Sequence, residues 1–182
     1  HVAGKLCIFR DVTVERDLEK QIRHSSNTDF LTGLYNRRCF YQYIHNNRGG
    51  RTVSLMYIDL DRFKEVNDTY GHKVGDAVLV HTADVLRRLF RDDFVARLGG
   101  DEFLVVRLGK CSMDQMEQEA EAFLKEMRTA FLAAEQTVSL SASVGIAQSS
   151  DSMVDIDALL QRSDQALYQA KKAGRSRYCV YR

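Results

Sequence analysis

The chain has 182 residues, of which 45% are hydrophobic and 28% charged, the length of one globular domain with a short extension. It has no proline and only 11 glycines, which excludes a collagen-like or low-complexity chain. Its 26 Lys and Arg against 25 Asp and Glu give a net charge of +1, without the positive field of a general nucleic-acid binder. No apolar stretch approaches the roughly 20 residues that span a bilayer. We therefore expect a cytoplasmic fragment with no nucleic-acid partner and no direct membrane contact. This expectation leaves open that the parent protein is attached to a membrane through another segment.

The first 26 residues differ in pattern from the rest and are predicted to form a separate leader. Residues 5–12 alternate loosely, as a strand does, and residues 14–25 place Val14, Leu18 and Ile22 at intervals of four on an otherwise charged helix. Three apolar positions leave two interpretations equally open, a plain amphipathic connector and a parallel dimerising helix. The globular domain is predicted to begin at about Asn27 and to extend to residue 182.

From Asn27 onwards, strand-like and helical segments alternate. Asn36 is placed to cap a helix that holds Phe40, Tyr43 and Ile44 on one side. The further predicted elements are a strand at 52–60, a helix at 76–90, a hairpin of strands at 94–98 and 103–108, a long helix at 113–135, a strand at 138–147, a helix at 155–173 ended by Gly174, and an edge strand at 177–181. The middle of the chain therefore predicts an α/β (α+β) fold with a ferredoxin-like β-α-β-β-α-β order and a sheet covered by helices.

Four cysteines, Cys7, Cys39, Cys111 and Cys179, are scattered without a CxxC pair. This spacing favours free thiols in a reducing compartment over a disulfide framework or a zinc site.

A first group of acids follows the apolar strand at 52–60. Asp59, Leu60 and Asp61 lie at its carboxyl end, where a strand delivers side chains to the rim of a sheet, and carboxylates suit Mg²⁺ or Mn²⁺. The alternative interpretation is that these aspartates only begin a turn.

A second group lies at the predicted hairpin tip. Gly99 and Gly100 allow close approach of a ligand, and the acids Asp101 and Glu102 follow them. If the hairpin lies beside the strand of Asp59, then Asp59 and Asp101 can share divalent cations that offset their repulsion and bind phosphate oxygens. Spacing alone leaves a solvated turn equally open.

Five segments in order resemble the GGDEF domains, the diguanylate cyclases. They are DFLTGLYNRR at 29–38, IDLDRFKEVNDTYGHKVGDAVL at 58–79, RLGGDEF at 97–103, SVGIA at 143–147 and DQALYQAKKAGR at 164–175. The resemblance implies a palm-like, nucleotidyl-cyclase-like domain over 27–182 that condenses two GTP molecules into cyclic di-GMP and releases pyrophosphate. It also implies a bacterial second-messenger role and catalysis by a homodimer, because each subunit holds one GTP.

The resemblance carries specific roles to matching residues. Asp59 and Asp101 would bind Mg²⁺ or Mn²⁺, two per active half-site, through their carboxylates, and Leu60 through its carbonyl. Asp101 would also activate the attacking 3′-hydroxyl, with Glu102 in support. The implied substrate-binding residues are Asn67, Asp76 and His72 at the guanine, Lys64, Lys171 and Arg175 at the triphosphate, and Phe63, Gly99 and Gly100 along the nucleotide.

Three points remain open in this part of the sequence. Asp76, after Gly75 and before an apolar helix, has the alternative role of an N-cap. His72, a lone histidine in a turn, is more often structural. Ser176 stands where the family usually has Asn.

The product-inhibition site of many cyclases is an RxxD motif, whose aspartate falls here on Asp93. Phe90 occupies the arginine position and cannot form a bidentate contact to phosphate or guanine. We therefore predict weak or absent feedback inhibition at this site.

The leader GKLCIFRDVTVERDLEKQIR is similar to the last strand and signalling helix of a PAS sensor domain.

The resemblance to the GGDEF domains leads to an active, GTP-specific diguanylate cyclase as the main hypothesis. The alternative is a non-catalytic GTP-binding GGDEF module that controls an adjacent domain.

Overall fold

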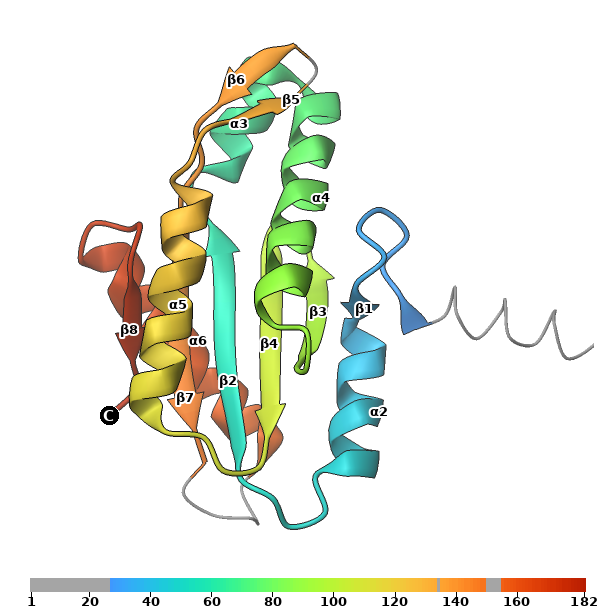
Figure 1. Ribbon diagram of the computed structural model, residues 1–182, viewed down its shortest axis with the longest axis vertical. Coiled ribbons are helices and arrows are strands. Elements are labelled where there is room, and N and C mark those ends of the chain that lie inside the picture. The colour runs from blue at the N-terminus through green and yellow to red at the C-terminus, as the bar shows by residue number, and fades with distance from the viewer. Residues whose placement is uncertain (1–26, 134, 150–154) are drawn as a thin grey trace, which may run out of the picture.

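The computed structural model describes residues 27–133, 135–149 and 155–182 (Figure 1). The predicted leader, with its PAS-like strand and signalling helix, lies outside these residues. Within them, no helix has the length and apolar character required to cross a membrane.

The centre of the fold is a six-stranded sheet in the order β1-β3-β4-β2-β7-β8. The strand β2 (Val53–Leu60) lies between β4 (Glu102–Leu108) and β7 (Ala142–Gln148), and it is antiparallel to both. Next to β4 lies β3 (Phe94–Gly99), which forms the antiparallel hairpin with it. The short edge strands β1 (Tyr35–Asn36) and β8 (Tyr178–Val180) run parallel to β3 and β7.

This arrangement confirms the ferredoxin-like prediction. The strands β2, β3, β4 and β7 follow the β-α-β-β-α-β order along the chain, and β2 lies centrally between the hairpin and β7. The carboxyl end of β2 therefore meets the tip of the β3-β4 hairpin and the start of β7.

Helices cover both faces of the sheet (Figure 1). One face packs against α4 (His72–Leu89) and α5 (Met113–Met127), and the other against α2 (Arg37–Asn47) and α6 (Ile156–Lys172). Successive side chains of β2 alternate between these faces, so Ile58 belongs to the first core and Tyr57 to the second. Asp59 continues the series of Tyr57 and is therefore directed to the face that α6 covers.

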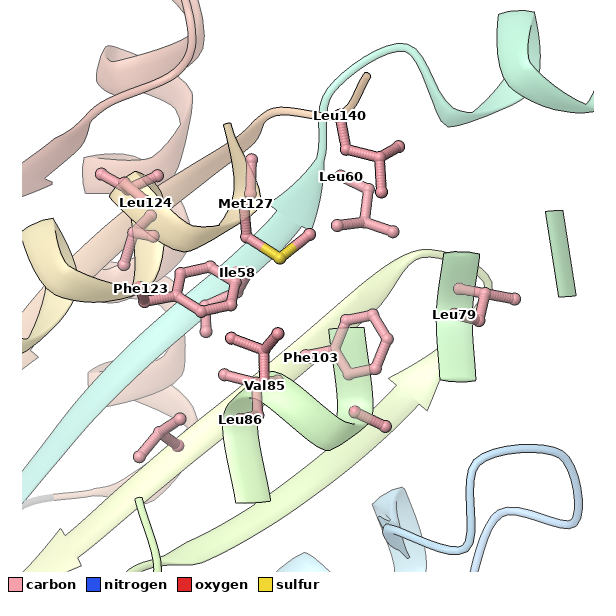
Figure 2. Close-up of a cluster of buried hydrophobic side chains, with 14 of the residues drawn as sticks. Ile58, Leu60, Leu79, Val85, Leu86, Phe103, Phe123, Leu124, Met127 and Leu140 are labelled. Atoms are coloured by element: carbon pink, nitrogen blue, oxygen red, sulfur yellow. The ribbon is translucent and has the colours of Figure 1, made fainter. Parts of the chain in front are cut away.

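The larger core holds the end of β2 in place. Figure 2 shows Leu60 beside Leu140, with Met127 of α5 and Phe103 of β4 in the same cluster. All four side chains are at most 6% exposed. The buried side chain of Leu60 thus anchors the strand at the point where its main chain reaches the candidate site.

Several predicted elements agree with the structure. Asn36 caps α2, because its side chain accepts from the Cys39 N–H, and Asp155 caps α6 in the same way. Among the described cysteines, Cys39, Cys111 and Cys179 are free.

The predicted helix at 113–135 was too long. The helix α5 ends at Met127, and the following residues form a small hairpin of β5 (Phe131–Ala133) and β6 (Gln136–Val138). Phe131 stacks on His81 of α4, with 4.1 Å between ring centroids, so packing overrides the helix propensity of this segment. Val138 consequently belongs to β6, and the predicted strand at 138–147 begins only at Ala142.

The predicted helix at 76–90 also begins elsewhere. A separate helix α3 (Phe63–Tyr70) precedes α4, and Gly71, with φ of 83°, forms the turn between them. Asp76 lies within α4, so the N-cap interpretation of Asp76 was wrong.

Candidate active site

The acids predicted to share a site do lie together. Asp59 on β2 is directly opposite Glu102 on β4 and Ser143 on β7. The Leu60 N–H donates to the Asp101 carbonyl across 3.3 Å, which joins the strand end to the hairpin tip. The antiparallel pairing of β2 with β4 thus supplies the adjacency that spacing alone left open.

The hairpin tip has a fixed conformation that requires glycine. Gly99 and Gly100 have φ values of 146° and 51°, which are accessible to glycine at little cost. The Arg97 guanidinium donates twice to the Gly100 carbonyl, at 2.9 and 2.7 Å, and once to Asp29 Oδ1 at 2.9 Å. Asp29 and Arg97 therefore brace the loop that presents Asp101.

A lysine from α6 reaches the first of these acids. Lys171 Nζ lies 2.8 Å from Asp59 Oδ1, with the two side chains 33% and 15% exposed. Burial raises the pKa of Asp59, as do the charges of Asp101 and Glu102, while the hydrogen bond and charge of Lys171 lower it. The site therefore gathers three acids whose negative charge Lys171 offsets in part.

The donors at this strand end fit a hard divalent cation. Asp59 and Asp101 offer carboxylates and Leu60 a main-chain carbonyl, the oxygen ligands that Mg²⁺ and Mn²⁺ prefer. No cluster of three His, Cys, Asp or Glu side chains suited to a metal occurs among the described residues.

Glu102 has a basic and an aromatic neighbour on the same face of the sheet. The Arg37 guanidinium lies 3.8 Å from its carboxylate, and Tyr57 extends from β2 to the same face of the sheet. Burial and the negative charge of Glu102 raise the pKa of Tyr57, so its hydroxyl stays protonated.

The residues predicted for guanine lie on α3 and α4. Asn67 is packed against Gly75, where an added Cβ would be 1.9 Å from Asn67 Oδ1 and 3.4 Å from the Phe63 ring. His72 and Asp76 are one turn apart on α4 and both exposed. The close contact of the two helices at Gly75 therefore brings Asn67, Phe63 and the Asp76 turn together.

The other basic residues predicted to bind the triphosphate lie in the segments that come directly after β2 and α6. Lys64 is exposed in the first turn of α3, where helix geometry directs main-chain N–H groups outward. Arg175 is exposed in the loop after α6, with φ of 64°. The neighbouring Lys172 instead lies over the Tyr168 ring, 4.5 Å from its centroid, and is exposed.

The aspartate of the product-inhibition motif already has an internal partner. Asp93 and Arg107 form an ion pair with an N–O distance of 2.5 Å, and Arg107 also lies 3.0 Å from Glu119. Phe90 is 2% exposed and belongs to the larger core. Neither position presents a free polar group to a ligand.

The sequence analysis missed the supporting role of two residues near the site, Asp61 and Arg128. Asp61 was grouped with the metal-binding acids, but its carboxylate accepts from Ser141, Ser143 and the Ser176 N–H. Arg128, beyond the end of α5, donates to Ser176. The position of Asp61 directly after a buried strand was a signal that its carboxylate is buried and hydrogen-bonded. No local sequence pattern indicated the contact of Arg128 with Ser176.

Comparisons with known proteins agree with this geometry. The family described as diguanylate cyclase, GGDEF domain, matches residues 26–177. The cyclic di-GMP phosphodiesterase PdeR of Escherichia coli K12 is 38% identical over 97% of this chain and 27% of its own length. The diguanylate cyclase DgcM of the same strain is 37% identical over 94% of this chain and 42% of its own length. The chain thus spans less than half of either relative.

A solved structure matches nearly the whole chain. The coiled coil and GGDEF domain of DgcB from Caulobacter crescentus, in complex with c-di-GMP, superposes with a TM-score of 0.86 and 28% sequence identity. The match covers 93% of each chain.

Proposed function

Because the chain belongs to the GGDEF family of diguanylate cyclase domains, we propose that it condenses two GTP molecules into cyclic di-GMP. The observation that carries the proposal is the meeting of Asp59, Asp101 and Lys171 at one strand end, with an ion-pair distance of 2.8 Å. Carboxylates for a cation and a lysine for phosphate are what a nucleotide-condensing site requires.

The reaction consists of two equivalent phosphoryl transfers. The 3′-oxygen of one GTP forms a bond to the α-phosphorus of the other, and the bond between that phosphorus and the bridging oxygen breaks. Pyrophosphate leaves with the electron pair, and Asp101 accepts the proton of the 3′-hydroxyl. Asp59, Leu60 and Asp101 would hold Mg²⁺ or Mn²⁺, which would supply charge neutralisation at the α-phosphate and the leaving group.

The other residues bind and orient the nucleotide. Lys171, Lys64 and Arg175 carry the positive charges that the triphosphate needs, and they lie on three separate elements around the strand end. Glu102, which lies 3.8 Å from the Arg37 guanidinium, would add to the negative field that holds the cation.

Guanine selectivity comes from the α3-α4 pair. The Asp76 carboxylate can accept from both the N1–H and the exocyclic amine of guanine, and Asn67 lies beside it across Gly75. Adenine offers no such pair of donors, so it would leave a carboxylate without partners, which disfavours ATP.

The proposed active form is a homodimer. One chain supplies one set of acids and cations and holds one GTP, while the product contains two nucleotides. The reaction therefore requires two copies that face each other with their triphosphates antiparallel.

A second candidate function is a non-catalytic GTP-binding module. The relative PdeR, at 38% identity, is named for a phosphodiesterase activity, and this chain matches only 27% of it. In that case the same residues would bind GTP and control a domain elsewhere in a longer protein.

Product chromatography after incubation of concentrated protein with GTP and Mg²⁺ tests the proposal. We expect cyclic di-GMP from GTP, none from ATP, and none from Asp101→Ala. The matched control is Asp84→Ala, which removes a surface acid of α4 whose side chain is 65% exposed and pairs with Arg87. GTP binding without product at high protein concentration would favour the second candidate.

A further inference from the structure

The loop after α6, which carries Arg175, has an unusual main-chain conformation. Gly174, Arg175 and Ser176 have φ values of 113°, 64° and 51°, so two consecutive non-glycine residues lie in the left-handed region. Side chains disfavour this region, and such conformations persist where the surrounding structure fixes them. Contacts from elsewhere in the fold must therefore hold the loop.

The first of these contacts comes from Asp61. Its Oδ2 accepts from the Ser176 N–H at 3.0 Å and from the Ser141 hydroxyl at 2.7 Å, and its Oδ1 accepts from Ser143 at 2.7 Å. Asp61 is 7% exposed, so this carboxylate is buried with three neutral donors. It lies two residues after Asp59, which means that the loop is tied to the same strand end as the metal-binding acid.

The second contact comes from Arg128, which follows α5. Its Nε donates to Ser176 Oγ at 3.0 Å and its Nη2 to the Ser176 carbonyl at 2.6 Å. Its Nη1 donates to Glu121 Oε1 of α5 at 3.0 Å, and this contact also orients the guanidinium. Ser176 is thus held through its N–H, its carbonyl and its hydroxyl.

These contacts have a direct consequence for the neighbouring cation. Arg175 lies between Gly174 and the clamped Ser176, and its N–H donates to the Ala170 carbonyl at 3.1 Å. Its exposed side chain leaves the loop in a direction that the main chain sets. A loop free to relax to ordinary φ values would direct that guanidinium elsewhere.

We propose that Arg128 and Asp61 are positioning residues that clamp Ser176 and thereby direct Arg175 towards the β- and γ-phosphates of bound GTP. This inference rests on the proposed function of the site. Neither residue contacts the nucleotide in this scheme. The clamp also accounts for a serine in the left-handed region at position 176, where an asparagine would be tolerated more readily.

The test compares two exposed arginines that form ion pairs with α5. Arg128→Ala removes the clamp, whereas Arg88→Ala removes only the pair of Arg88 with Glu126, far from the loop in sequence. The probes are 3′-deoxy-GTP with Mg²⁺, which lacks the attacking hydroxyl, and GMP, which lacks the β- and γ-phosphates. Calorimetric titration measures the affinity of each variant for both.

We expect Arg128→Ala to bind 3′-deoxy-GTP about tenfold more weakly than the wild type, the loss of one charge-assisted phosphate contact. Its affinity for GMP should stay within twofold, and Arg88→Ala should match the wild type with both probes. Asp61→Asn, which keeps the size of the side chain, should show the same selective loss if it folds with an unchanged circular dichroism spectrum.

Two results would overturn the inference. If Arg128→Ala and Arg88→Ala bind 3′-deoxy-GTP equally well, the clamp has no role in phosphate binding, and the proposed function stands. If Arg128→Ala loses GMP binding to the same extent, its role is general stability instead. Failure of the wild type to bind 3′-deoxy-GTP would contradict the proposed function and this inference together.

Discussion

Lys171, in the last turn of α6, forms an ion pair with Asp59 at the end of β2, with 2.8 Å between Nζ and Oδ1. The contact joins two sequence-distant elements at the point where the metal and the triphosphate are proposed to bind. In this arrangement the ammonium group neutralises the same carboxylate that would bind the cation. Under the proposed function, Lys171 and a divalent cation would therefore compete for Asp59 until phosphate oxygens offered the lysine another partner.

The first prediction follows from this competition. Lys171→Gln should bind Mg²⁺ more tightly without nucleotide, by about fivefold for a partly exposed ion pair of roughly 1 kcal/mol. The same variant should lose cyclic di-GMP formation, because a phosphate contact is gone. Mg²⁺ titration followed by thermal shift and product chromatography measure the two effects.

The control for this experiment is Lys172→Gln, which removes the adjacent lysine that lies over Tyr168. It should leave both Mg²⁺ affinity and product formation near the wild-type values. Weaker Mg²⁺ binding by Lys171→Gln would show that the lysine does not compete for Asp59.

A second prediction concerns the contact between α3 and α4. In Gly75→Ala the new Cβ would lie 1.9 Å from Asn67 Oδ1, so the Asn67 side chain must move away. We expect the KM for GTP to rise about tenfold, since one guanine contact is lost. Stability should change little, because alanine is the better helix former by up to roughly 1 kcal/mol.

A double-mutant cycle distinguishes this route from a general disturbance of the helix pair. If Gly75→Ala acts through Asn67, then Gly75→Ala combined with Asn67→Ala should be no worse than Asn67→Ala alone. Additive losses in the steady-state kinetics would mean that the two substitutions act independently.

The sequence predicted the central elements of the fold because their signals are local. The strand β2 is an apolar run that ends in acids, and the β3-β4 hairpin turns at paired glycines. The end of α5 and the β5-β6 hairpin were missed because they depend on the packing of Phe131 against His81, which no local pattern reveals. The break between α3 and α4 at Gly71 was missed because one glycine in a polar segment is a weak signal.

The same distinction applies to the site. Asp59 and Asp101 were indicated by their positions at a strand end and a hairpin tip, but only the pairing of β2 with β4 brings them together. The bracing of Gly100 by Arg97, and of Ser176 by Arg128, joins groups that sequence reasoning had no means to pair. Supporting contacts of this kind depend on the finished fold.

A third prediction concerns pH. His81 on α4 stacks on Phe131, and burial lowers its pKa below the usual 6.5. The positive charge of Arg88 lowers this pKa further, whereas the negative charges of Asp84 and Glu126 raise it. The unfolded chain therefore binds a proton at His81 more readily than the folded one, so stability falls as pH decreases below about 6.5. We expect His81→Gln to flatten the decline in the free energy of unfolding between pH 7 and 5.

Urea denaturation at a series of pH values measures this effect. The matched control is His45→Gln, which removes an exposed histidine on α2 and should retain the wild-type slope. An unchanged slope in His81→Gln would show that other groups cause the acid sensitivity.

The last prediction concerns product binding at the RxxD position. Asp93 is paired with Arg107 at 2.5 Å and its side chain is 6% exposed, while the buried Phe90 replaces the arginine of the motif. We expect cyclic di-GMP to bind weakly or not at all there, and Asp93→Ala to leave any residual binding unchanged. The same substitution should lower the free energy of unfolding by roughly 2 kcal/mol, because it removes a charged partner of Arg107.

Calorimetric titration with cyclic di-GMP and urea denaturation provide the two measurements. Asp92→Ala, at the exposed neighbouring acid, is the control and should change neither stability nor binding. Tight cyclic di-GMP binding that disappears in Asp93→Ala would contradict the prediction. It would mean that cyclic di-GMP displaces Arg107 from Asp93. The ion pair would then be the ligand-free state of a working inhibitory site.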